Sequence, residues 1–349
     1  MKRYKIAIII ASIVIIFGSI AAVVASFFPK KNSAQNQSPN EATAEKTPET
    51  ATSLLDGMPY AKNVANRNPI AASVENHPDA RPQFGLSSAS IVYEAITEGG
   101  ITRYLAVFAP KDAKEIGPIR SARLFFMDWL VEYGAFFAHA GGNEDALANI
   151  SNYGIKDLNH SQTYFWRDGK GRKVASEHTL YSSTEKLYQY ATSKKFETAK
   201  SSFDALKFKT DGPATPQGKG VEINFSTNQY KVRWSYDATT NAYSRFLAGR
   251  EDKDASNNTQ LTAKNIIIQE VKRTLRPTGN YGGENWVMTT TGTGRAHIFR
   301  DGTTIEATWK KPTRDSRTKF YDANNVEIEF NPGNTWYEII PPESNYNSI

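Results

Sequence analysis

The chain has 349 residues, of which 39% are hydrophobic and 12% aromatic, a composition suited to a folded protein with a sizeable core. Its formal net charge of +6 lies almost wholly in residues 1–31, so the rest of the chain gives no reason to expect nucleic acid as a partner. The sequence contains no cysteine, which excludes disulfides, thiolate catalysis, cysteine-based zinc sites and an acylated lipoprotein cysteine.

The N-terminal segment is apolar and flanked by basic residues. The uncharged run 6–28 is long enough to cross a bilayer, and we expect a single transmembrane helix there. A removable signal peptide is the alternative, but the run exceeds a usual signal-peptide core. Basic residues before the run predict a cytoplasmic N-terminus at 1–5, with the bulk of the chain extracytoplasmic. Residues 29–56 lack aromatic side chains and predict a disordered linker.

Residues 57–210 predict a mixed α/β domain. Apolar runs indicate strands at 69–76, 90–96, 101–108 and 135–140, and Gly99-Gly100 predicts a hairpin between the second and third. Helices are expected at 121–133, after an N-cap at Asn143, and near 183–194, where Ser182 and Glu185 have capping-box spacing. Strands that alternate with helices are typical of this class.

Residues 211–343 predict a β-rich second domain. Short β-like runs are separated by Gly, Asn and Asp, and hairpin turns are expected at 300–303 and 322–325. The boundary between the domains falls somewhere in the polar stretch 197–220. The predicted fold class is therefore α+β, with an N-terminal membrane helix followed by an α/β and a β-rich domain.

Two arginines stand at the predicted start of the helix 121–133. Arg120 and Arg123 gain nothing from a helix start, where the backbone dipole favours anions. Together with Arg103 on the neighbouring strand they could hold one anion, because a guanidinium matches carboxylate or phosphate at two points. The alternative is that each arginine pairs with a nearby acid such as Glu98, and the sequence favours neither interpretation.

A second candidate site lies between residues 139 and 145. A strand that ends in Gly-Gly and opens a helix lets backbone N–H groups approach a phosphate, and His139 could transfer a proton. Asn143 would face the same ligand. The plainer interpretation is a tight strand–helix turn, which is favoured because Glu144 and Asp145 already satisfy the helix dipole.

Two polar loops complete the candidates. The basic segment 165–181 carries Arg167 and His178 and is either a mobile loop over a site or a solvated surface loop, the latter being favoured. The loop after the first strand carries Glu75 and His77 and either contributes to a cleft or merely connects two strands. The five histidines show no metal-ligand spacing, so no metal site is expected.

Several catalytic signatures are absent from the sequence. It has no Walker loop, no His-Glu-x-x-His pair and no G-x-S-x-G elbow. Serine-hydrolase, metalloprotease and nucleotide-hydrolase functions therefore have no support, and no catalytic residue can be named.

Four long runs resemble the YerB-like envelope proteins of bacteria, a family of unknown function. They begin "NRNPIAASVENHPDARPQFG", "IGPIRSARLFFMDWL", "FWRDGKGRK" and "GTGRAHIFRDGTTIEATWKK", and lie within residues 66–341. The resemblance implies an N-terminal and a smaller C-terminal domain displayed outside the membrane. Many members look like lipoproteins, whereas this chain has no cysteine to acylate. The family implies no reaction or cofactor.

A fainter resemblance is to the LytR-CpsA-Psr phosphotransferases, on the order of "ITRYLAVFAP", "IGPIRSAR" and "AHAGG". It implies that Arg103, Arg120 and Arg123 hold a lipid pyrophosphate and that Glu98 approaches a divalent cation. The Arg-Ser-Asp-Thr signature of that family is missing here. Mg²⁺ is expected only if this similarity reflects function.

Three hypotheses follow. The leading one is an envelope module, anchored in the membrane by its N-terminal helix, that binds an anionic peptidoglycan or lipid-linked cell-wall precursor. The alternatives are a phosphotransferase acting on lipid-pyrophosphate-linked glycopolymers and a non-catalytic scaffold for other envelope proteins. The candidate ligand-binding residues are Glu98, Arg103, Arg120, Arg123, His139, Asn143, Arg167 and His178.

Overall fold

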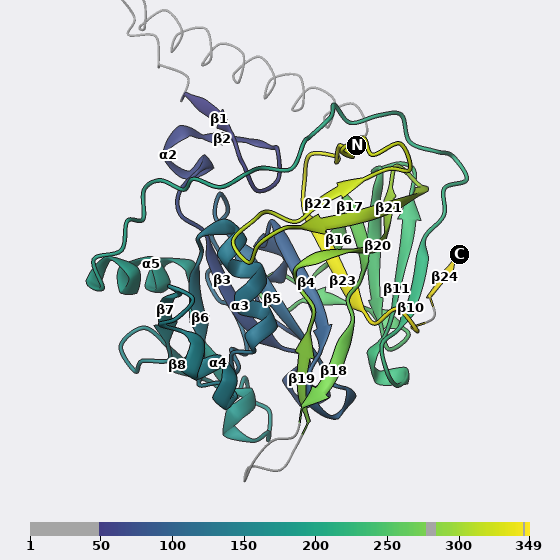
Figure 1. The fold of residues 1–349 in the computed structure, drawn as a ribbon. Coiled ribbons are helices and arrows are strands. Elements are labelled where there is room, and N and C mark those ends of the chain that lie inside the picture. Colours follow the sequence, from purple (N-terminus) through teal and green to yellow (C-terminus); the bar gives the residue numbers. More distant parts are fainter. Residues whose placement is uncertain (1–48, 277–283, 345) are drawn as a thin grey trace, which may run out of the picture. The chain divides into compact units, whose positions relative to one another are not determined.

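A mixed sheet of ten strands forms the centre of the molecule (Figure 1). The computed structural model describes residues 49–276, 284–344 and 346–349. In spatial order the strands are β22 (Lys319–Tyr321), β21 (Thr303–Lys311), β20 (Gly292–Arg300), β17 (Asn265–Glu270), β23 (Thr335–Ile340), β4 (Ile91–Ile96), β5 (Thr102–Phe108), β3 (Ile70–Glu75), β6 (Phe136–His139) and β7 (Lys156–Asn159).

Both predicted regions of the chain contribute strands to this sheet. β23 lies parallel to β17 on one side and to β4 on the other, so a C-terminal strand directly adjoins an N-terminal one. β5 pairs antiparallel with β4 and β3, and β6 is parallel to β3 and β7. The predicted α/β and β-rich segments are therefore continuous through backbone hydrogen bonds.

Both faces of the central strands are buried, which explains why they read as continuous apolar runs. Along β3, Ile70, Ala72 and Val74 enter one core and Ala71 the other. The second core is closed by α3 (Leu124–Leu130) and a 3₁₀ turn (Val131–Tyr133), through the aromatic side chains of the helix. Figure 1 shows α3 lying across β3 and β5.

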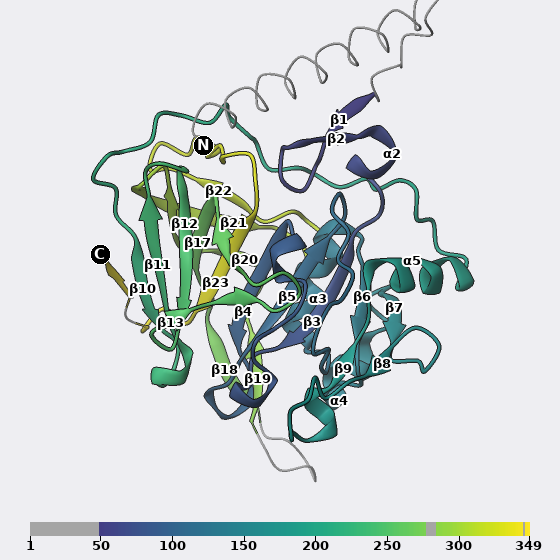
Figure 2. The same cartoon turned by 180° about the vertical axis from the view of Figure 1, so that it is seen from behind.

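A second sheet covers the other face. Its strands are, in order, β13 (Arg250–Glu251), β12 (Ala242–Leu247), β11 (Lys231–Asp237), β10 (Val221–Asn224) and β24 (Tyr346–Ser348), with β16 (Thr262–Ala263) beside β12. Its inner residues, among them Val232 and Trp234, pack against the central sheet. Helix α5 (Thr184–Ser193) covers the β6–β7 end of this face through Leu187 (Figure 2).

Four two-stranded sheets and two short helices lie outside these two large sheets in the described part of the chain. The two-stranded pairs are β1 (Thr50–Thr52) with β2 (Pro59–Ala61), β8 (Trp166–Arg167) with β9 (Leu180–Tyr181), β14 (Lys253–Asp254) with β15 (Thr259–Gln260), and β18 (Arg273–Arg276) with β19 (Asn285–Met288). Two short helices are α2 (Lys62–Ala65) and α4 (Glu144–Asn149). The described chain is thus mixed and strand-rich with few helices, which confirms the coarse α+β class.

A buried charge network crosses the junction between β4 and β23. Glu338 lies directly beside Glu94 in the parallel ladder, and both are fully buried. The Arg245 guanidinium, from the second sheet, pairs with Glu94 and Asp252. The Trp234 indole N–H donates to Glu338 Oε1 at 2.7 Å. Burial, together with the neighbouring Glu94, raises the pKa of Glu338 to about 8.

Several predicted turns are confirmed. Strands β4 and β5 form the expected hairpin, and both glycines of Gly99-Gly100 adopt positive φ in its turn. The turn 300–303 joins β20 to β21, and Asn325 N–H donates to Asp322 O in the turn 322–325. In each case the turn residues supply the backbone conformation that the hairpin needs.

One predicted helix start and one predicted N-cap are wrong. The helix expected from residue 121 begins at Leu124, because Ile119 and Ala122 form β-bridges with Val74 and Gly142. The N-cap of α5 is Ser183, whose hydroxyl accepts from Lys186 N–H at 3.2 Å, rather than Ser182. Ser182 instead donates its hydroxyl to Tyr164 O at 2.8 Å.

The end of the predicted linker 29–56 is ordered. Strand β1 pairs with β2, Leu55 is buried in the core below α3, and Asp56 accepts from the Ser90 hydroxyl at 2.8 Å. Residues 29–48, the predicted membrane helix 6–28 and the predicted cytoplasmic segment 1–5 lie outside the described residues. Among the residues that are described, no helix has the length and apolar content needed to cross a membrane.

Candidate functional site

A polar cavity of about 310 Å³ lies where the central strands β3, β4 and β5 meet their loops. Charged side chains of both signs line it, namely Arg103, Arg120, Arg123, Glu75, Glu98 and Glu177. The three arginines proposed from the sequence therefore converge on one hollow, the arginine cavity, and three carboxylates lie among them.

The strand register places Glu75 and Arg103 together. Glu75 is the last residue of β3, and Arg103, near the start of β5, stands opposite it in the antiparallel ladder. Residues opposite each other in such a pair share a face of the sheet. An apolar strand that ends in a carboxylate thus delivers that carboxylate to the cavity.

Arg120 reaches the cavity from an extended segment. Its backbone N–H donates to Ser73 O at 2.8 Å and its carbonyl accepts from Ala140 N–H at 3.0 Å, so this segment bridges β3 and β6. Its Nε lies 3.1 Å from Glu75 Oε1, and its Nη2 lies 3.6 Å from Glu177 Oε1. Arg120 is therefore paired with acids of the protein itself.

Arg123 is also paired. It precedes the first residue of α3, and its guanidinium grips Glu98 at two points, with Nε 2.6 Å from Oε1. Glu98 lies in the 3₁₀ turn Glu98–Gly100 of the β4–β5 hairpin. Burial opposes ionisation of Glu98, but the hydrogen bonds and charge of Arg123 outweigh it and hold the pKa below its usual range.

Arg103 differs from the other two. It is 5% exposed, and in the described part of the chain no carboxylate forms an ion pair with it. Its Nη1 donates to Ser121 O at 3.0 Å, and its Nε has no hydrogen-bond partner among the described residues. Burial, followed by repulsion from Arg123, lowers the pKa of Arg103 to about 9. The cavity therefore holds one buried cation that lacks a directly paired anion.

Two histidines, His77 and His178, also line the cavity. His178, at the end of the 3₁₀ turn Ser176–His178, is buried, and its Nδ1 lies 2.9 Å from Glu75 Oε2. The His77 ring stacks on it with centroids 4.9 Å apart. Glu75 thus joins Arg120 to His178, one carboxylate oxygen facing each.

Two predicted site residues lie elsewhere. His139 is fully buried, with Nε2 2.8 Å from Asp157 Oδ1 and Nδ1 2.7 Å from Gly141 O. Asn143 caps α4 and donates to Asn285 Oδ1 at 2.9 Å. Neither lines the arginine cavity, and the contacts of both support the plainer interpretation of a strand–helix turn.

Arg167 does not line the cavity either. It lies exposed in β8 and donates to Ser176 O. The loop between β8 and β9 is held down by Arg172, which donates to Asp79 O and Arg81 O at 2.9 Å each. From the sequence, the loop after β3 could either contribute to a cleft or merely connect two strands. In the structure, Glu75 and His77 line the cavity, which agrees with the first interpretation. Glu177, beside the predicted His178, was not singled out.

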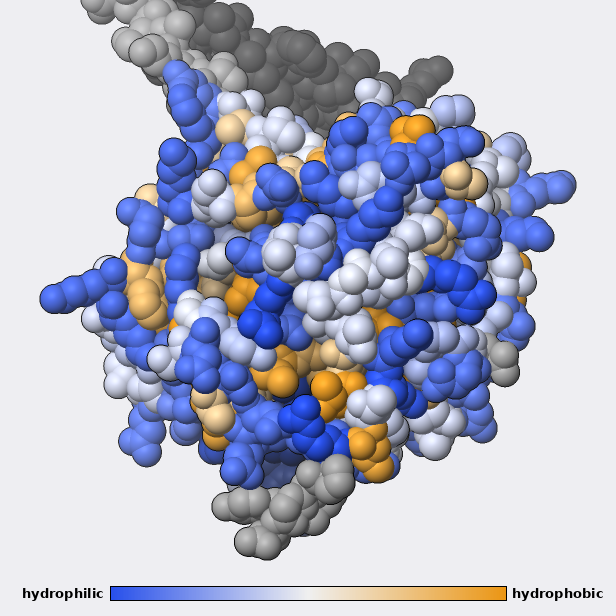
Figure 3. Space-filling model, viewed as in Figure 1, coloured by the Kyte–Doolittle hydropathy of each residue, from blue (hydrophilic) through white to orange (hydrophobic). Residues whose placement is uncertain are grey.

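Two other cavities among the described residues are larger, about 820 Å³ beside α5 and about 520 Å³ beside β12 and β13. Figure 3 shows mostly hydrophilic residues on this face, with hydrophobic atoms in small separate groups. The exposed large apolar side chains of the described residues are Met58, Leu147, Leu275, Val326 and Ile349. The cavity at the ends of β3, β4 and β5 is distinguished from the two larger cavities by gathering the three arginines that the sequence predicted as ligand-binding.

The fold and this cavity define an α+β protein that presents clustered arginines and carboxylates at one end of a mixed sheet. Residues 55–197 match the family model described as "Protein of unknown function (DUF3048) N-terminal domain", and residues 221–337 match the corresponding C-terminal domain. The chain belongs to this family.

Two comparisons agree with that assignment. The chain is 30% identical over 310 residues to a protein of Bacillus subtilis (strain 168) named "Putative lipoprotein YerB", covering 84% of this chain and 88% of the relative. A crystal structure of the YerB protein from Bacillus subtilis matches with a TM-score of 0.75 and 27% identity, covering 85% of this chain and 99% of that one. The YerB-like resemblance is therefore confirmed.

Proposed function

We propose that the chain binds an anionic group of a cell-envelope molecule in the cavity around Arg103, on the outer side of the cytoplasmic membrane. The observation that carries the proposal is the buried Arg103 guanidinium without an ion-pair partner among the described residues. A buried charge without a partner costs several kcal/mol, so an anion from outside the chain would find a cation there already desolvated.

The size of the cavity narrows the ligand. About 310 Å³ is at the lower limit of small-molecule sites, so it suits one charged group rather than a whole glycopolymer. Arg123 and Arg120 flank Arg103, and their own acids keep the net charge of the walls low. A phosphate or sugar carboxylate is the class of anion that the planar guanidinium fits.

The envelope location rests on different support. The relative's name, "Putative lipoprotein YerB", describes a protein held at a membrane surface. This chain has no cysteine to carry a lipid, and the apolar run 6–28 is the part of its sequence suited to membrane attachment. We therefore propose a membrane-attached protein whose ligand is a cell-wall or lipid-linked anion.

Calorimetric titration tests the binding proposal. The full chain in detergent micelles is titrated with inorganic phosphate, pyrophosphate and N-acetylmuramate, as wild type, Arg103→Met and Arg167→Met. We expect binding of at least one probe, weakened roughly tenfold or more in Arg103→Met, because a charge-assisted hydrogen bond is lost. Arg167 lies outside the cavity, so Arg167→Met should bind like wild type.

Two outcomes would overturn the proposal. One is that none of the three probes binds to wild type. The other is that Arg103→Met, folded like wild type by circular dichroism, binds with unchanged affinity. Either result would leave the arginines as internal braces.

A further inference from the structure

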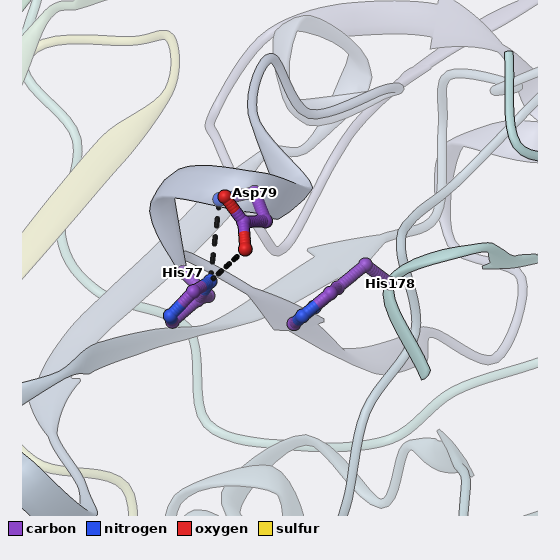
Figure 4. Close-up of side chains that lie close together, drawn as sticks. All are labelled: His77, Asp79 and His178. Atoms are coloured by element: carbon purple, nitrogen blue, oxygen red, sulfur yellow. Dashed lines mark hydrogen bonds and ion pairs between the residues drawn. The ribbon is translucent and has the colours of Figure 1, made fainter. Parts of the chain in front are cut away.

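Three side chains able to ligate metal gather beside the arginine cavity. His77, Asp79 and His178 each offer a donor atom within 4.8 Å of those of the other two. Figure 4 shows the two imidazole rings lying parallel, with the Asp79 carboxylate above His77. The cluster joins two segments about a hundred residues apart in the sequence, which is why histidine spacing gave no sign of it.

His178 is held as metal-binding histidines usually are. Its Nδ1 contacts Glu75 Oε2 at 2.9 Å, and both side chains are buried. When a carboxylate accepts the proton of Nδ1, the lone pair of the ring lies on Nε2. In the described part of the chain no hydrogen bond engages that Nε2. Glu75 therefore orients His178 with a free donor atom.

The other two ligands stand on one short turn. His77 Nδ1 accepts from Asp79 N–H at 3.2 Å, and Asp79 Oδ2 lies 3.7 Å from the same nitrogen. Nδ1 of His77 thus carries a lone pair that accepts from the Asp79 backbone, and a metal bound to this nitrogen takes the place of that hydrogen bond. Arg172 fixes the backbone of the turn by donating to Asp79 O at 2.9 Å.

We propose that His77, Asp79 and His178 bind a divalent transition metal of the zinc type. Two imidazoles and one carboxylate make a three-ligand set that leaves further coordination positions open, as in catalytic zinc sites. Imidazole nitrogen suits zinc, iron or nickel, whereas Mg²⁺ takes oxygen ligands. The expectation of no metal, drawn from sequence spacing, is replaced by this proposal.

Binding requires the donors to move closer together. Two ligands on one tetrahedral zinc ion lie about 3.3 Å apart, given bond lengths of about 2.0–2.1 Å. The side chains of Asp79 and His77 are 62% and 33% exposed and can rotate, whereas His178 is 8% exposed and remains fixed. Metal therefore binds first to Nε2 of His178, and the side chains of His77 and Asp79 then rotate toward it.

This proposal does not rest on the proposed anion-binding function. The metal ligands and Arg103 are different residues, and Glu75 contacts His178 and Arg120 through separate oxygens. His77 and His178 also line the arginine cavity, so an open coordination position would face it. A metal there would add positive charge beside the guanidinium groups.

Zinc titration tests the proposal directly. The full chain, purified in detergent without a polyhistidine tag, is titrated calorimetrically with Zn²⁺ and separately with Mg²⁺. We expect one zinc ion per chain with micromolar or tighter affinity, no response to Mg²⁺, and visible absorption bands when Co²⁺ replaces zinc. His178→Ala should lose zinc roughly a hundredfold, and Glu75→Gln about 10–100-fold, because the orienting carboxylate is weakened.

Matched variants keep the test decisive. His160→Ala alters an exposed histidine outside the cluster and should bind zinc like wild type. Should His178→Ala fail to fold, His77→Ala removes a ligand from a partly exposed position and should also lose zinc. Arg103→Met should retain zinc binding, which separates this site from the anion site. The proposal is overturned if wild type binds no zinc, or if folded His77→Ala binds it unchanged.

Discussion

Arg103 and Glu338 are buried ionisable groups whose charged forms have too few partners. Arg103 faces an accessible cavity, whereas Glu338 lies in the core with one oxygen accepting from Trp234 and the other unpartnered among the described residues. Burial therefore lowers the pKa of the arginine and raises that of the glutamate. Both residues cost stability, but only Arg103 is placed to recover that cost by binding a ligand.

The Arg103→Met substitution should raise the melting temperature. Methionine fills much of the same space without a buried charge, and the lost bond to Ser121 O is the smaller effect. We expect an increase of roughly 2 °C or more at pH 7 by calorimetry, since about 1 kcal/mol gives such a shift in a protein of this size. Exposed Arg167→Met is the control. A fall of several degrees in Arg103→Met would mean that the arginine is a structural brace.

The Glu338→Gln substitution should flatten the dependence of stability on pH. Below the ordinary glutamate pKa, both folded and unfolded chains carry the proton. As pH rises toward 8 the unfolded chain loses it while the folded chain keeps it, so the free energy of unfolding falls. Glutamine keeps an acceptor for Trp234 and has no proton to lose.

Melting temperatures between pH 5 and pH 8.5 measure this effect. Wild type should lose stability relative to Glu338→Gln across that range, with the gap widest at the alkaline end. Glu329→Gln, at an exposed position, should follow wild type. Parallel curves for wild type and Glu338→Gln would show that Glu338 is ionised in the fold throughout.

At the scale of elements, local patterns predicted the hairpins and long-range contacts decided the site. The β4–β5 hairpin follows from apolar runs on either side of Gly99-Gly100. Arg120, by contrast, is placed by hydrogen bonds to Ser73 and Ala140, which no local pattern reveals, and this is why its helix was expected too early. Contacts such as Glu75 with His178, 103 residues apart, depend on the folded sheet.

Ser182 and Ser183 illustrate the same limit. Both serines precede α5, and the spacing to Glu185 selects Ser182 as the cap. In the fold Ser182 faces inward to Tyr164, so Ser183 is left to accept from the helix backbone. Sequence spacing finds the helix start to within a residue, and tertiary packing decides which hydroxyl serves it.

The loop between β8 and β9 should loosen when Arg172 is replaced. Its guanidinium ties that loop to the turn carrying Asp79 and Arg81 through two carbonyl oxygens. In Arg172→Ala we expect faster amide exchange over residues 77–81 and 168–178, measured by hydrogen–deuterium exchange, with the core strands unchanged. Lys173→Ala, at an exposed neighbouring position, should exchange like wild type. Equal exchange in Arg172→Ala and wild type would show that the loop is held by other contacts.

For the whole molecule, the shared sheet matters more than the division of the sequence. The two family segments end and begin near residues 197 and 221, yet β23 from the second lies between β17 and β4. Without β23, strand β4 loses the backbone hydrogen bonds along one of its edges, and the buried Glu94 loses its neighbour Glu338. Neither segment carries a complete central sheet.

Fragments 49–210 and 211–349 should therefore fail to fold separately. Each would expose apolar strand edges that the intact sheet covers. We expect weak near-ultraviolet circular dichroism and no cooperative urea transition for either fragment, against a single transition for the full chain. A cooperative transition in one isolated fragment would show that the segments are independent domains.

The central claim, that the buried Arg103 meets negative charge from outside the chain, is tested most directly by a crystal structure of the protein grown with pyrophosphate. The account predicts a pyrophosphate in the cavity with an oxygen within hydrogen-bond distance of Arg103, while Arg123 remains paired with Glu98. An empty cavity at a saturating concentration, or an Arg103 side chain turned onto a carboxylate of the protein, would contradict it.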